Sequence, residues 1–127
     1  MTLPGPARVE SAQLSSESSA RANPVLEWNQ IFIDTLIATS TPNSSSQRLG
    51  AIVHTAMFDA YNGIDQRYTP IFVRTTAPNG ASRGAAVVAA AYTALVGLFP
   101  SQQPSLEARY AASLAVLSDA CDQSGRL

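Results

Sequence analysis

The sequence has no lysine, one histidine and one cysteine, and each scarcity excludes a kind of chemistry. Without lysine the chain has no Schiff-base residue and no phosphate-binding P-loop lysine. A single cysteine, Cys121, excludes an intrachain disulfide and a cysteine-rich zinc site, and we expect it to be a small core residue. The formal net charge of −1 gives no electrostatic footprint for nucleic acid or an anionic membrane.

The two ends of the chain differ in composition from its centre. Residues 1–22 contain five serines and no aromatic residue, which predicts a disordered tail. They lack the apolar segment of a signal peptide, although Ala20-Arg21-Ala22 has the small-x-small form of a cleavage site. Residues 123–127 are expected to be a tail or a truncation point. One helical domain is therefore expected over residues 23–122.

Apolar residues at helical spacing predict an all-α fold with four main helices, at about 24–39, 45–64, 81–99 and 103–121. Asn23 and Pro24 suit the start of the first helix, Ser44 to Ser46 read as capping residues before the second, and Asn62-Gly63 reads as its end. The connection over 65–80 contains a short stretch, Tyr-Thr-Pro-Ile-Phe-Val, that we do not expect to form a sheet. Short loops favour an up-and-down bundle.

Each helix has an expected core stripe. The third helix carries no charge from Gly84 through Leu106, so we expect it to be the central, buried one; its apolar run is too short to span a bilayer. The other stripes are Val25, Trp28, Phe32 and Leu36; Leu49, Ile52, Val53, Ala56, Met57, Ala60 and Ile64; and Leu106, Tyr110, Leu114, Leu117 and Cys121.

Few side chains are candidates for a functional site, and structural roles fit them better than catalytic or metal-binding ones. His54 has no second histidine and no carboxylate one turn away, so we predict a hydrogen-bonded histidine at a helix interface rather than a metal ligand or general base. For Asp59 we weigh acid–base work against a structural contact with Arg48 or a helix N-terminus. Asn29 lies in the apolar stripe of the first helix and should hydrogen-bond to another helix.

Arginine and serine offer two further possibilities. The arginines in or beside the long connection, Arg67, Arg74 and Arg83, are suited to an oxyanion, but their spacing matches no phosphate motif and a solvated loop is the other interpretation. The serines at 44–46 have no base nearby and no G-x-S-x-G turn, so they are not expected to be nucleophiles.

Several segments together resemble one family, the vanadium-dependent haloperoxidases of the type-2 phosphatidic acid phosphatase superfamily. They are VLEWN at 25–29, Arg48, HTAMFDAYNGI at 54–64, RYTP at 67–70, APNGAS with its alanine-rich helix, and LFPSQ at 98–102. The most specific segment is HTAMFDAYNGI, whose family form reads close to HAAMYDAVNAI. The resemblance runs from about residue 23 to residue 118.

The resemblance implies a protein of two related helix bundles, of which this chain looks like the N-terminal one. The family's vanadate or phosphate site lies in the C-terminal bundle and is built from a lysine, an Arg-Pro pair, a Pro-Ser-Gly-His motif and a later Ser-Arg and histidine. None of these motifs occurs here. Trp28, Asn29, Arg48, His54, Asp59 and Asn62 therefore carry over as signature positions with structural roles, and no catalytic, cofactor or metal residue is expected. His54, Asp59 and Asn62 are expected to be hydrogen-bonding groups between helices.

Three functions remain open on the sequence. The first is the N-terminal scaffold part of a haloperoxidase or acid-phosphatase-like enzyme, inactive alone, with the C-terminal bundle or a second copy as partner and vanadate or phosphate bound only in the intact protein. The second is a non-catalytic interaction protein that dimerises or docks to a partner. The third is an unrelated four-helix small-molecule binder. The resemblance also implies a secreted or periplasmic location, without a visible signal peptide.

Overall fold

The computed structural model describes residues 23–74 and 81–125, with side chains through Asp119. The tail expected over 1–22 and the core position expected for Cys121 lie outside the described residues. The helices are α2 (Pro24–Ala38), α3 (Asn43–Asp65), α4 (Arg83–Leu98) and α5 (Gln103–Gly125), with a short 3-10 turn, η1 (Pro100–Gln102), before α5. The described residues form no strand. The predicted all-α four-helix bundle is confirmed.

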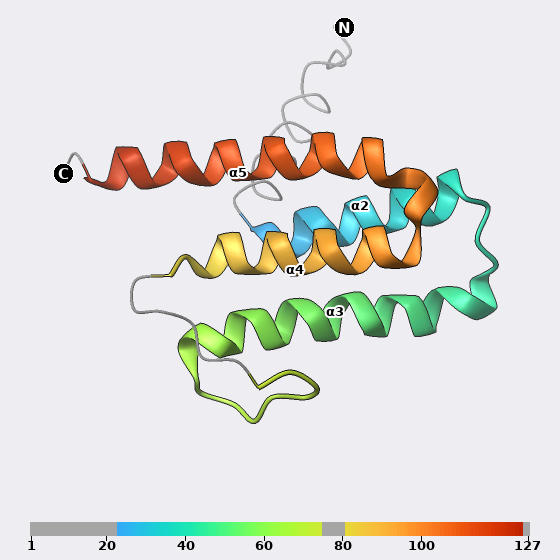
Figure 1. The fold of residues 1–127 in the computed structure, drawn as a ribbon, viewed down its shortest axis with the longest axis horizontal. Coiled ribbons are helices and arrows are strands. Elements are labelled where there is room, and N and C mark those ends of the chain that lie inside the picture. The colour runs from blue at the N-terminus through green and yellow to red at the C-terminus, as the bar shows by residue number, and fades with distance from the viewer. Residues whose placement is uncertain (1–22, 75–80, 126–127) are drawn as a thin grey trace, which may run out of the picture.

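Successive helices run in alternating directions, and α4 lies between α3 and α5 (Figure 1). Helix α4 contacts α2, α3 and α5. It therefore occupies the central position expected from its lack of charge. No helix in the described ranges has the length and apolarity needed to cross a membrane.

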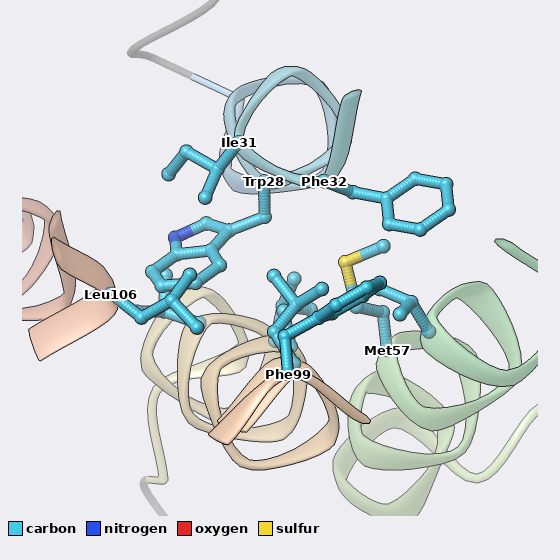
Figure 2. Packing of buried hydrophobic residues seen from close by; sticks show 11 residues of the cluster. Trp28, Ile31, Phe32, Met57, Phe99 and Leu106 are labelled. Carbon is cyan, nitrogen blue, oxygen red and sulfur yellow. The ribbon is translucent and has the colours of Figure 1, made fainter. Parts of the chain in front are cut away.

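The core is a single cluster to which every helix contributes. In Figure 2, Trp28, Ile31 and Phe32 project from α2 into the space where Met57, Phe99 and Leu106 converge. Trp28 and Val53 are fully buried, as are Val88, Ala91 and Leu95. Tight packing of this kind fixes the helices relative to one another, since an interior has few voids into which a side chain can shift.

Helix starts follow local capping chemistry where the sequence offers a cap. Asn23 accepts hydrogen bonds from the backbone N–H groups of Val25 and Leu26 at 3.0 and 3.5 Å, and Pro24 takes the first helical position, as predicted. Ser82 accepts from the N–H of Ala85 at 3.2 Å at the start of α4.

Two helix boundaries differ from the predictions for α3. The helix begins at Asn43, directly after Pro42, so Ser44 to Ser46 lie in its first turn instead of capping it. It also passes through Asn62-Gly63 and ends at Asp65, where Gln66 adopts a left-handed conformation with φ of 52°. Asn62 stays helical because its side chain is engaged elsewhere, as shown below. Helix α5 also extends beyond the expected end at 121, through Gly125.

Two residues predicted for the core stripes are instead exposed. Val25 is 36% exposed and Ile52 is 41% exposed. Helix α2 turns Ile31 and Thr35 inward in addition to Trp28 and Phe32, which rotates Val25 to the edge of the buried face. Ile52 projects toward the connection that follows α3, away from the core.

Candidate functional site

The C-terminal half of α3 organises the connection that follows it, and Asp59 is the centre of this arrangement. Its side chain is 4% exposed. One carboxylate oxygen accepts a hydrogen bond from the N–H of Ile71 at 2.8 Å, and the other accepts from Phe72 and Val73 at 2.8 and 2.9 Å. Three of the roughly four acceptor sites of the carboxylate are therefore used, with both oxygens bonded.

These contacts determine the charge state of Asp59. The hydrogen bond from the backbone of Val73, followed by that from Ile71, holds the pKa of this carboxyl below its ordinary value. Burial opposes this effect, and the bond from Phe72 adds to it. Asp59 is therefore an ionised acceptor near neutral pH, because the three bonds favour the charged form.

Asn62 holds the same connection one turn further along α3. Its Nδ2 donates to the carbonyl oxygen of Tyr68 at 2.6 Å, and its Oδ1 accepts from the N–H of Tyr68 at 2.9 Å. The side-chain amide thus pairs with both backbone groups of one residue. We call Asp59 and Asn62 together the α3 clamp.

The contacts of the α3 clamp differ from two predictions made from the sequence. Asp59 was expected to contact Arg48 or a helix N-terminus, and Asp59 and Asn62 were expected to bond between helices. Both instead bind the backbone of the connection over residues 68–73. The connection has no regular secondary structure to pair its own N–H groups, so side chains from α3 supply the acceptors.

His54 and Asn29 join α2 to α3, as predicted. The Nε2 of His54 lies 2.8 Å from the Oδ1 of Asn29. With Asn29 Oδ1 as the acceptor, Nε2 carries the proton. The histidine ring is on the exposed side of the interface, beside a shallow surface formed with Val25, Met57 and Tyr61.

Two of the three arginines in or beside the connection, Arg67 and Arg83, form ion pairs. Arg67 and Arg83 both contact Asp65, each with an N···O distance of 3.1 Å, and Arg83 also lies over the ring of Tyr61 at 5.8 Å. One carboxylate is therefore shared by two of the cations. Arg48 lies elsewhere, at the edge of an apolar groove against Ile52 and Phe72.

One buried polar network was missed by sequence reasoning. The indole Nε1 of Trp28 donates to the Oγ of Ser113 at 3.1 Å, and that hydroxyl donates to Oε1 of Glu27 at 3.0 Å. Ser113 is 2% exposed. Its place among Leu106, Tyr110 and Leu117 at helical spacing was the available signal, since a serine inside an apolar stripe needs a partner.

No group of three or more His, Cys, Asp or Glu side chains in the described ranges is placed to hold a metal ion. Among the polar signature residues, Asn29, His54, Asp59 and Asn62 hydrogen-bond within the fold. Their arrangement positions backbone and neighbouring helices. No protein-family model, curated protein or solved structure matches the chain in comparisons with known proteins.

Proposed function

We propose that this chain is the N-terminal scaffold part of a vanadium-dependent haloperoxidase or acid-phosphatase-like enzyme. The intact enzyme would oxidise halide with peroxide or hydrolyse phosphate esters, and this part alone would do neither. The proposal rests on the resemblance of VLEWN, HTAMFDAYNGI and RYTP to the family.

A scaffold role is supported by the contacts that the signature residues make within the fold. Asn29 and His54 join two helices, and Asp59 and Asn62 hold the connection after α3. Trp28 fills the core and donates to Ser113. Side chains that are already bonded within the fold suit a supporting part better than a substrate site.

The described residues do not fit vanadate or phosphate. A multiply charged oxyanion needs several cations directed at one point. The chain has no lysine, and in the described residues Arg67 and Arg83 are both paired with Asp65. We therefore place the oxyanion site outside this chain and derive no catalytic step through it.

The proposed partner is a C-terminal catalytic bundle of the same protein. In support, Leu26 and Ile37 on α2, and Phe72 after α3, are large apolar side chains more than half exposed. Exposed apolar surface of this kind is typical of a face that another element covers.

The test is to sequence the gene beyond the codon for Leu127. We expect an open reading frame with a lysine, an Arg-Pro pair and Pro-Ser-Gly-His in that order. The purified 127-residue chain is expected to oxidise no bromide with peroxide and vanadate, and to hydrolyse no p-nitrophenyl phosphate. Activity of the chain alone contradicts its inactivity, and a stop codon directly after Leu127 contradicts the scaffold role.

The same exposed apolar residues favour a second candidate, a non-catalytic helical protein that dimerises or docks to a partner. A stop codon after Leu127 supports this candidate. A downstream catalytic bundle in the same frame contradicts it.

A further inference from the structure

Helix α2 has an apolar face that the bundle leaves uncovered. Leu26, Ile33 and Ile37 are 53%, 38% and 72% exposed. Their spacing of seven and four residues places them on one side of the helix, opposite Trp28 and Thr35, which are buried. From Leu26 to Ile37 this stripe runs for three turns, roughly 16 Å. We call it the α2 stripe.

A groove of matching length lies on the outer side of α3. Its floor follows one side of the helix from Arg48 to Asp59, the same sequence separation as the α2 stripe and so again roughly 16 Å. Ala51 and Ala56 keep the floor low, and it is walled by Ile52 and by the connection at Ile71, Phe72 and Val73. The groove has a volume of about 430 Å³. We call it the α3 groove.

The wall of the α3 groove is pre-organised. The three N–H bonds to Asp59 fix the backbone of residues 71–73. Ile71 and Phe72 nevertheless remain 65% and 87% exposed. A wall already held in place loses little conformational entropy when a partner binds, which favours docking.

The α2 stripe and the α3 groove lie on segments of opposite net charge. Residues 43–74 and 81–83, which include the groove, hold four arginines and two carboxylates, and the carboxylates are bonded to backbone N–H groups or to two of the arginines. Residues 24–38, which include the stripe, hold two carboxylates and no arginine. The arginines are Arg48, Arg67, Arg74 and Arg83. The carboxylates of α2 are Glu27, whose Oε1 accepts from Ser113, and Asp34, which lies 3.7 Å from Arg109 of α5.

We propose that the α2 stripe of one copy of this chain binds in the α3 groove of a second copy. Both surfaces are apolar, they match in length, and their surroundings are opposite in charge. With α2 antiparallel to α3 of the other copy, Asp34 approaches Arg48 at the edge of the groove. This inference rests on the second candidate above, a protein that dimerises, because a C-terminal bundle that covered Leu26, Ile37 and Phe72 would exclude a second copy from the same residues. Sequencing beyond Leu127 decides between the two candidates, and sedimentation of the 127-residue chain tests the pairing by itself.

The test uses two substitutions at exposed positions, Ile37→Asp in the stripe and Phe72→Asp at the groove, with Val116→Asp on α5 as the control. Val116 is 45% exposed and belongs to neither surface. Sedimentation velocity over a range from low micromolar to millimolar chain should show association of the wild type and of Val116→Asp. Each of the other two variants should weaken self-association at least about tenfold, with unchanged helical circular dichroism.

Mixing the two variants identifies the pairing. The Ile37→Asp chain keeps an intact groove and the Phe72→Asp chain keeps an intact stripe, so their mixture should form a one-to-one complex that neither forms alone. A wild-type chain that stays monomeric throughout the range overturns the proposal. So does a mixture that fails to associate, or association that survives both substitutions.

Discussion

A single carboxylate, that of Asp59, organises three consecutive backbone N–H groups of the connection after α3. Its neighbour Asn62 pairs with both backbone groups of Tyr68. At the residue scale, two polar positions of HTAMFDAYNGI, Asp59 and Asn62, therefore hold backbone that has no helix or sheet partner. Ser113 plays a comparable role inside the bundle, where it links Trp28 to Glu27.

Replacement of Asp59 tests the α3 clamp. We expect Asp59→Ala to lower the midpoint of thermal unfolding by at least about 4 °C, because three N–H groups lose a charged acceptor. Cleavage by a protease within residues 68–74 should also become faster. Asp34→Asn, at a carboxylate that is 46% exposed, is the control and should change the midpoint little. Equal midpoints for Asp59→Ala and the wild type would contradict a structural role for Asp59.

Removal of one hydroxyl tests the buried network at Trp28. Ser113→Ala leaves the indole N–H without its acceptor and should lower the free energy of unfolding by about 1–3 kcal/mol. The only tryptophan reports the change directly, through a shift in its fluorescence in the folded protein. Ser118→Ala, at an exposed position of the same helix, should stay within about 0.5 kcal/mol of the wild type. A similar result for both variants would show that the bond to Ser113 contributes little.

At the scale of the element, the end of α3 is set by its side-chain contacts more than by local signals. Asn62 and Gly63 offer a helix stop, yet the helix runs on to Asp65 because Asn62 must face Tyr68 and Asp65 meets both Arg67 and Arg83. The chain then turns at Gln66, which adopts a left-handed backbone with φ of 52°. An L-residue with a Cβ is disfavoured there.

Gln66→Gly tests this turn. Glycine adopts the left-handed region without steric cost, so we expect the free energy of unfolding to rise by about 0.5–1 kcal/mol. Urea unfolding gives the value, and an unchanged slope against urea would show that the unfolded state is unaffected. Gln47→Gly, inside α3, is the matched control and should lower stability by about 1 kcal/mol. A loss of stability in Gln66→Gly would mean that the glutamine side chain has a role of its own.

At the scale of the whole molecule, α4 is the shared neighbour of the other helices and the connection after α3 is fastened to the outside of the bundle. Because the ionised carboxylate of Asp59 holds the connection, the free energy of unfolding depends on the charge of Asp59 and is therefore sensitive to acid. Its pKa is lowered in the folded protein by the backbone bonds, first that of Val73. In the unfolded chain an aspartate titrates near its ordinary value of about 3.9.

The sign of the pH effect follows from proton binding. Between the ordinary value and the lower folded pKa, the unfolded state binds the proton and the folded state does not, so stability rises with pH there. The contribution of Asp59 is thus complete above about pH 4 to 5 and is lost as the pH falls through its folded pKa. Urea unfolding at a series of pH values should show the wild type losing its advantage over Asp59→Asn only below that range. A constant difference between the two proteins down to the lowest pH would contradict the charged clamp.

The pattern of apolar and charged residues was enough to predict the helices and the central place of α4. Apolar residues at helical spacing and the uncharged run from Gly84 to Leu106 are sufficient for both, because a helix must bury its apolar side. The Asn23 cap and the contact of Asn29 with another helix also followed from local rules for unpaired polar groups. The inactive, scaffold interpretation of His54, Asp59 and Asn62 remains a prediction from the resemblance.

The partners of Asp59, Asn62 and Ser113, and the exposure of Ile52, could not be predicted from the sequence and follow from the three-dimensional arrangement of the chain. The partners of Asp59 lie 12 to 14 positions away, and Ser113 is 85 positions from Trp28. Periodicity tells which side of a helix is apolar, but it does not tell which backbone segment will pass close to a given carboxylate. Which backbone segment lies close to Asp59 depends on how the connection folds back over α3. The path of the connection depends in turn on all the contacts of the folded chain together.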